Sequence, residues 1–258
     1  MAPLVETVIR QAVKTFTKSP NAPSSTVFRE NFENLVSHVN HLTYNDVRLD
    51  RSLLVSNTMN HRRAPVTYVE ILENKEVTIG IFILRPGAKL PLHDHPLMYG
   101  ILKVIFGKVS IQSYTLVKKP TVPEKLVEPN GDVSGTSSGS DASSSSLSSL
   151  ETSDYLYSEI PLLANKHPSM IVSDTDSCCV LTPTERNLHE IRTVDGPAAF
   201  IDILSPPYYS VIPDVGPRQC LYFIEVGSEK SLVKLKPVPN QSEYWNDTAP
   251  YQGPPINN

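Results

Sequence analysis

The sequence predicts an all-β protein, an antiparallel sandwich or barrel preceded by helices. Beyond residue 65 the chain contains roughly ten short segments that are rich in β-branched and aromatic residues and are separated by turn signals. No long helical pattern lies between these segments, as a parallel α/β sheet would require. With 258 residues, of which 40% are hydrophobic and 19% charged, the chain is long and apolar enough to bury one core.

The N-terminal 60 residues are predicted to form a helical extension that packs on a β domain of residues 61–258. Apolar residues recur at three- and four-residue spacing over residues 5–16 and again over residues 28–39. This spacing places them on one face of a helix. Pro20 and Pro23 lie between the two stripes and predict two separate helices.

The predicted strands form two groups on either side of a serine-rich segment. The first group comprises VTYVEIL, VTIGIFIL, YGILKVIFG and KVSIQSYTLV, with Pro86-Gly87 and Gly107-Lys108 as turns. The second comprises SMIVS, CCVLT, NLHEIRTV, AAFIDIL, CLYFIEV and SLVKL. Between them, residues 134–149 contain ten serines in sixteen positions. We expect about 119–160 to form a flexible loop, because this composition cannot bury enough apolar area to offset the entropy of ordering.

Composition and charge argue against several classes of function. A formal net charge of −4 disfavours a nucleic-acid partner, and no apolar run reaches the roughly 18 residues that a membrane helix needs. Three cysteines cannot all pair with one another, which excludes a disulfide scaffold and favours a reducing compartment. The first residues also lack the features of a secretory signal. We therefore expect a cytoplasmic protein. We also expect it to be a monomer.

The most informative segment for chemistry is His93-Asp94-His95. Side chains alternate faces along a strand, so His93 and His95 point the same way and Asp94 points the other way. Two imidazoles on one strand can share a metal ion, and a third ligand must then come from elsewhere in the barrel. The alternative is a chance pair of solvated histidines, which the β-rich context after the Pro86-Gly87 turn disfavours.

The third ligand must come from the remaining histidines, which are His38, His41, His61, His167 and His189. The first two lie in the predicted helical region, the next is flanked by arginines, and His167 borders the serine-rich loop. His189 lies in a strand-like segment of the second group, which a barrel would bring across from His93. Position therefore favours His189, and strand alternation points Glu190 away from it.

At this point the sequence resembles a known family. The pattern G-x5-H-x-H followed by G-x6-G, over residues 87–107, resembles the first cupin motif. Cupins usually have a glutamate ligand where this chain has Gly100, and its loss leaves the three-histidine site typical of thiol dioxygenases. The segments PLHDHPLMYGILKVIFG, VLTPTERNLHEI, VDGPAAFIDILSPPY and RQCLYF are similar to the branch of that family that contains cysteamine dioxygenases and plant cysteine oxidases. The resemblance covers about Val66 to Tyr251.

The resemblance implies a cupin-type β-barrel, also called a double-stranded β-helix or jelly roll. It implies one mononuclear non-haem Fe(II) per chain, held by His93, His95 and His189. The implied reaction is oxidation by O2 of cysteamine, or of the N-terminal cysteine of a protein, to the sulfinic acid. This conversion removes four electrons from sulfur, which one O2 can accept, so no organic cofactor is needed. An enzyme of this kind would also be suited to oxygen sensing.

The resemblance further implies roles for four residues. Asp202 lies where the family places a carboxylate near the substrate ammonium; the alternative is an ion pair with a surface lysine or arginine. Tyr208 would donate a hydrogen bond to bound oxygen or substrate, or cap the barrel rim. Cys220 and Tyr222 form a C-x-Y pair that can become a thioether cross-link, or are two core residues.

Two other classes of function remain open from the sequence. One is a different cupin metalloenzyme, such as an isomerase or a dioxygenase of a carbon substrate. The other is a cupin binding module that holds a metal or ligand without turnover.

Overall fold

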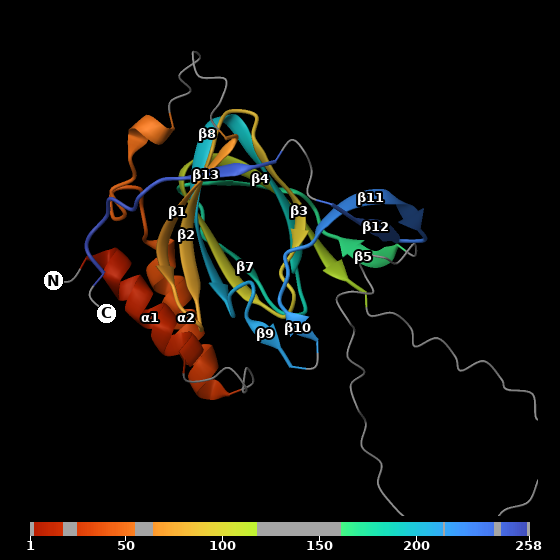
Figure 1. Ribbon diagram of the computed structural model, residues 1–258, viewed down its shortest axis with the longest axis horizontal. Helices are drawn as coiled ribbons and strands as arrows, with labels where there is room; N and C mark the ends of the chain where they lie inside the picture. Colours follow the sequence, from red (N-terminus) through yellow and green to blue (C-terminus); the bar gives the residue numbers. More distant parts are fainter. Residues whose placement is uncertain are drawn as a thin grey trace, which may run out of the picture.

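The protein is a β-barrel with two helices packed against one side (Figure 1). The computed structural model describes residues 3–17, 25–54, 64–117, 161–213, 215–239 and 244–256. This architecture confirms the predicted all-β, cupin-type barrel with helices at its N-terminal side. The predicted loop at 119–160 lies outside the described residues, as does His61. The domain division at residue 60 remains a prediction.

The described residues contain two α-helices, one short 3-10 helix and thirteen strands. They are α1 (Leu4–Thr17), α2 (Thr26–Asn40), η1 (Arg51–Leu53), β1 (Val66–Glu73), β2 (Thr78–Leu84), β3 (Lys89–Asp94), β4 (Tyr99–Leu116), β5 (Leu162–Lys166), β6 (Met170–Ser173), β7 (Cys179–Leu181), β8 (Leu188–Ser205), β9 (Val211–Ile212), β10 (Gly216–Pro217), β11 (Tyr222–Glu229), β12 (Leu232–Val238) and β13 (Asn246–Thr248).

β8 is the central strand of the barrel. It pairs antiparallel with β2, β3 and β4. β3 continues through β11 and β12 to β5, and β5 pairs with β4. Since β4 also pairs with β8, the path β8-β3-β11-β12-β5-β4 closes on itself. Closure leaves the inner faces of these strands turned toward one interior.

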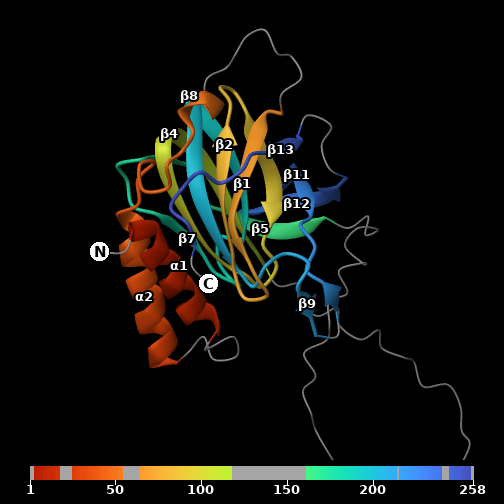
Figure 2. The same cartoon turned by 60° about the vertical axis from the view of Figure 1, so that its left-hand side comes forward.

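The two helices cover the outer face of β1, β2, β4 and β8 (Figures 1 and 2). Their apolar stripes are those that the sequence spacing predicts, and Leu35 and Val39 of α2 are completely buried. The hydroxyl of Ser25 caps α2 by accepting a hydrogen bond from the N–H of Phe28. Phe28 packs on Tyr99 of β4, with ring centroids 5.1 Å apart, and this contact fixes α2 on the barrel.

β4 and β8 correct one prediction, because each is continuous over 18 residues where the sequence suggested two short strands. The Gly107-Lys108 signal belongs to a bulge rather than a turn: pairing with β8 shifts register between Val104 and Phe106 and again between Phe106 and Lys108. Gly107 has φ +71°, and a Cβ there would lie 2.3 Å from the carbonyl oxygen of Pro197. Asp195 and Gly196 likewise bend β8 with positive φ values without ending it.

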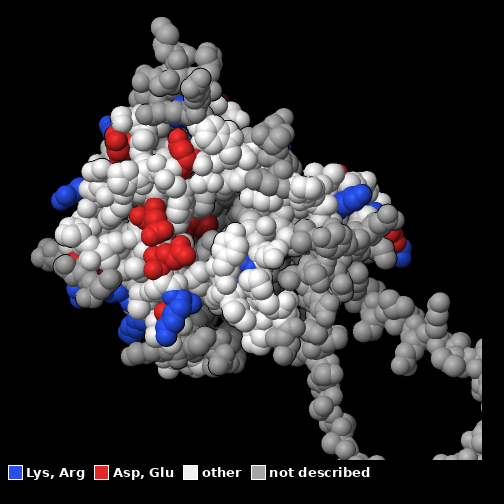
Figure 3. Space-filling model, in the orientation of Figure 1, with Lys and Arg blue, Asp and Glu red and all other residues white. Residues whose placement is uncertain are grey.

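The face of the molecule in Figure 3 carries acidic side chains near its centre and most of its Lys and Arg toward the edges. In the described part of the chain, no helix combines the length and the apolar character needed to cross a bilayer.

Candidate metal centre

Three histidines converge at the junction of β3 and β8. His93 is directly opposite His189 in the β3–β8 ladder, and the N–H of His95, just past the end of β3, donates to the Asn187 carbonyl at 2.8 Å. One ligand nitrogen from each ring lies within 4.8 Å of the others. The Nε2 atoms of His95 and His189 are 3.1 Å apart. All three side chains are buried, so the rings form a closed cluster that can hold one metal ion.

The other described histidines lie elsewhere. His41 follows α2 and its Nδ1 is 2.8 Å from the Ser37 carbonyl, while His38 belongs to the last turn of that helix. His167 lies 2.8 Å from the Thr115 hydroxyl through Nε2. Among the residues that the structure describes, the trio on β3 and β8 is the group of His, Cys, Asp and Glu side chains that could bind a metal.

Hydrogen bonds at Nδ1 set the tautomers of two of these rings. His93 Nδ1 lies 2.7 Å from the Pro91 carbonyl oxygen, which can only accept, so Nδ1 donates. Tyr208 donates its hydroxyl proton to the Asp94 carbonyl at 2.6 Å, so its oxygen accepts from His95 Nδ1 at 3.0 Å. In both rings the Nε2 lone pair is therefore left free for a metal, an arrangement common to histidine ligands.

Burial keeps the imidazoles neutral. Desolvation lowers the pKa of His93, and it lowers the pKa values of His95 and His189 strongly, with repulsion among the three rings adding to the effect in the latter two. Metal binding requires deprotonated imidazole nitrogens, so the cluster is ready to accept an ion near neutral pH.

The neighbouring carboxylates face away from the cluster, as strand alternation predicts. Asp94 accepts a hydrogen bond from the N–H of Leu221 at 2.8 Å, and burial raises the pKa of Asp94 to about 7. Glu190 pairs with Arg192 at 2.5 Å. The converging ligands are thus all neutral imidazoles, which leaves the charge of a bound divalent ion uncompensated.

A cavity of about 170 Å³ adjoins the three rings. Tyr208, Cys220, Tyr222 and Asp202 line it together with the histidines. Cys220 lies just before β11, and its thiol is hydrogen-bonded to the hydroxyls of Tyr208 and Tyr222. Burial raises the pKa of Cys220 to about 12, so it is a neutral thiol. The structure therefore brings all seven residues singled out from the sequence to one place.

Asp202 lies on the inner face of β8. Its neighbours Ile201 and Ile203 pack under the helices, so alternation turns Asp202 toward the barrel interior. The Asp202 side chain is 7% exposed, and burial raises its pKa to about 7. A hydrogen bond from the Ile203 backbone N–H lowers this pKa, but by less than burial raises it. Within the described ranges it has no ion-pair partner, so the structural ion pair considered from the sequence is not present there.

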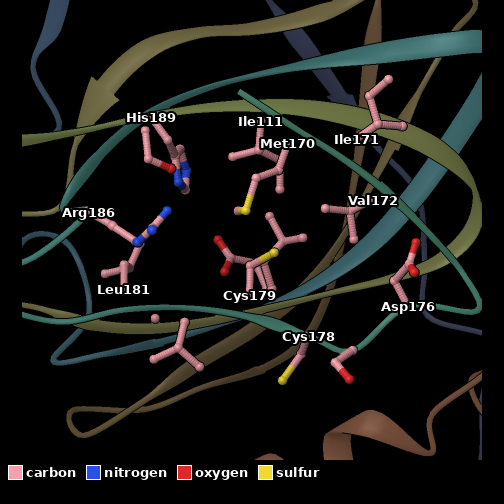
Figure 4. Close-up of a pocket in the computed structure, with 16 residues that line it drawn as sticks. Ile111, Met170, Ile171, Val172, Asp176, Cys178, Cys179, Leu181, Arg186 and His189 are labelled. Carbon is pink, nitrogen blue, oxygen red and sulfur yellow. The ribbon is translucent and has the colours of Figure 1, made fainter. Parts of the chain in front are cut away.

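A second, larger pocket of about 580 Å³ also reaches His189 and Asp202. Figure 4 shows the side chains of Arg186, Met170 and Cys179 pointing into it beside His189. This pocket could not be identified from local sequence patterns, because one wall comes from β4, which is far along the chain from β6 and β7 on the other side. The one sequence signal was the position of Arg186, three residues before His189.

Comparison with known proteins gives consistent matches. The PCO_ADO family model matches residues 38–256. A protein of Mus musculus described as 2-aminoethanethiol dioxygenase is 30% identical over 99% of this chain and 97% of its own length. A Homo sapiens protein with the same description is also 30% identical, with the same coverage. Plant cysteine oxidase 1 of Arabidopsis thaliana is 25% identical over 64% of this chain and 44% of that protein.

Replacing His189 by alanine is expected to lower the affinity for a divalent transition metal at least about 100-fold, since an outer-sphere partner alone is typically worth 10–100-fold. Metal content after anaerobic loading with Fe(II) and desalting measures the effect. His167→Ala is the matched control, because it removes an imidazole outside the cluster. Full metal retention in His189→Ala, with loss in His167→Ala, would show that the third ligand is misassigned.

Replacing Asp202 by asparagine is expected to stabilise the metal-free protein above neutral pH. The carboxyl ionises near its ordinary pKa of 3.8 in the unfolded chain but at about 7 when folded. The raised pKa therefore lowers the free energy of unfolding progressively as the pH rises from about 4 to 7. Above pH 7 this destabilisation reaches its full size. Urea unfolding should show a gain of about 1–4 kcal/mol at about pH 8 and a much smaller one near pH 4.5. A structural ion pair at Asp202 would instead make the variant less stable at the higher pH.

Proposed function

This chain belongs to the PCO_ADO family, and we propose that it is a thiol dioxygenase that oxidises an aminothiol with O2, RSH + O2 → RSO2H, at one mononuclear Fe(II) per chain. The observation that carries the proposal is the convergence of neutral imidazoles from His93, His95 and His189 next to a buried carboxylate. The relatives named for 2-aminoethanethiol and for cysteine oxidation support cysteamine and N-terminal cysteine as substrates.

The ligand set suits this chemistry. Imidazole is a ligand that iron accepts, and three neutral rings without a carboxylate favour an anionic thiolate as the partner of a divalent ion. When bound there, Fe(II) would supply the redox chemistry that transfers four electrons from sulfur to O2. The protein's own contribution is to hold the three Nε2 lone pairs in place and to enclose them in a small cavity.

We assign Asp202 to the ammonium of the substrate. An aminothiol carries its cation two carbons from sulfur, and Asp202 lines the same cavity as the three histidines. A substrate ammonium next to the carboxylate would lower its raised pKa and offset the cost of burying its charge. The substrate ammonium would thus be the ion-pair partner that the buried Asp202 lacks in the protein itself.

Tyr208 serves first as a positioning residue for His95. Its hydroxyl bridges the Asp94 carbonyl and His95 Nδ1 and so fixes both the ring orientation and the tautomer. The role expected from the family resemblance, donation to oxygen or substrate, would require this proton to leave the Asp94 carbonyl. Whether Tyr208 positions His95 or donates a hydrogen bond to oxygen or substrate, its hydroxyl lies next to the proposed metal site.

Cys220 and Tyr222 are the proposed cross-link pair. Their thiol and hydroxyl are already in hydrogen-bond contact at the cavity wall. A thioether between the sulfur and the tyrosine ring would remove two electrons and two protons, for which O2 is an available oxidant. It would lock the position of Tyr222, whose ring centroid lies 6.4 Å from that of His93.

We further propose that the protein acts as a cytoplasmic monomer and that its demand for O2 allows it to report oxygen supply. Three free thiols in the described structure support a reducing environment.

The direct test is the product of turnover. Iron-loaded protein incubated in air with cysteamine, and separately with a peptide that begins with cysteine, should add two oxygen atoms to the thiol, as measured by mass spectrometry. In 18O2 both atoms should carry the label. A preparation that binds zinc or manganese stoichiometrically and takes up no O2 with either substrate would instead support another cupin metalloenzyme or a binding module.

Asp202→Asn is expected to keep its iron and lose about 10- to 100-fold in kcat/KM for a free Cys-initiated peptide, the value of one charge-assisted contact. N-acetylating the peptide should cost the natural enzyme a similar factor and cost the variant little. The four kcat/KM values form a double-mutant cycle. Additive losses from mutation and acetylation would rule out the ammonium contact.

A further inference from the structure

Arg186 has a buried donor without a partner. Its Nη1 atom is buried and makes no hydrogen bond, and Arg186 forms no ion pair, within the part of the chain that the structure describes. A guanidinium is always charged and offers five N–H donors. A buried N–H donor that has no hydrogen-bond acceptor costs free energy. We therefore expect a ligand to supply an acceptor for Nη1.

The backbone holds Arg186 at a fixed place beside the metal centre. Its N–H donates to the hydroxyl of Thr115 at 2.9 Å, and its φ of +55° is one that few non-glycine residues adopt. Arg186 precedes His189 by three residues, so their Cα atoms are at most about 10 Å apart. Strain at a residue adjoining a site is typical of functional positions.

Arg186 points into the larger pocket, together with Met170 and Cys179 (Figure 4). This pocket of about 580 Å³ shares His189 and Asp202 with the cavity of about 170 Å³ at the metal centre. Cysteamine has only four non-hydrogen atoms and needs a small part of this space. Volumes of about 300–1,000 Å³ are typical for ligands of drug size, which indicates a substrate that extends well beyond the aminothiol.

We propose that Arg186 binds a carboxylate carried by the thiol substrate, and that the substrate is a peptide whose N-terminal cysteine is followed by Asp or Glu. This inference rests on the proposed thiol dioxygenase function. Asp202 then meets the N-terminal ammonium and Arg186 meets the acidic side chain, so the two side chains recognise opposite charges of one substrate. The planar guanidinium matches a carboxylate with two parallel hydrogen bonds.

The test compares kcat/KM for two peptides that differ only in Cys-Asp against Cys-Asn at their start. The natural enzyme should prefer the Asp peptide about 10- to 100-fold. Arg186→Gln should bring this ratio close to one, Arg186→Lys should keep part of it, and Arg186→Glu should favour a Cys-Lys peptide. Arg192→Gln is the matched control and should leave the ratio unchanged, because Arg192 pairs with Glu190 outside both pockets.

A parallel comparison of L-cysteine with cysteamine identifies the source of the carboxylate. If the Arg186-dependent advantage belongs to L-cysteine rather than to the Asp peptide, the carboxylate site stands, with a free amino acid as its ligand. A ratio near one in the natural enzyme, or equal losses for both peptides in Arg186→Gln, would overturn the inference while turnover itself upholds the proposed function. Natural enzyme that oxidises no thiol at all would overturn the proposed function and this inference with it.

Discussion

The antiparallel pairing of β3 with β8 is the constraint on which the metal centre depends. It sets His93 opposite His189 and brings the His95 backbone to Asn187. Because side chains alternate along a strand, a slip of one residue would turn His189 to the outer face. β8 is held against such a slip by pairing with β2 on one side and by the bulged pairing with β4 on the other. The strand pairing of the barrel therefore fixes the relative positions of the three histidines.

Polar groups at the site divide into those that are satisfied by the protein and those left for a ligand. Tyr208, the Asp94 carbonyl and His95 Nδ1 satisfy one another, and Arg218 donates to the Pro96 carbonyl next to them. In the described structure Asp202 has no ion-pair partner, and Arg186 has neither an ion-pair partner nor a hydrogen bond at its buried Nη1. Satisfied networks rigidify a site, whereas buried charges without partners lower stability and persist where function requires them. These two unpaired charges are therefore the groups that we propose to contact the substrate.

Much of this could be predicted from local sequence patterns. The apolar stripes predicted both helices, and alternation placed His93 and His95 on one face with Asp94 on the other. His189 followed from its position in the second strand group. The patterns failed at Gly107 and Asp195-Gly196, because a glycine signal does not distinguish a turn from a bulge inside a long paired strand. Arg186 was missed because its significance lies in a pocket that exists only once β4, which is distant in sequence, pairs with β7 and β8.

We propose that three histidines and no carboxylate hold the iron. A crystal structure of the iron-loaded protein, with anomalous diffraction collected at the iron edge, tests it most directly. We expect a single iron peak whose protein ligands are the Nε2 atoms of His93, His95 and His189, with the carboxyl group of Asp202 in the cavity but not bound to the metal. A carboxylate ligand from Asp94 or Asp202, or an iron peak away from the β3–β8 junction, would contradict it.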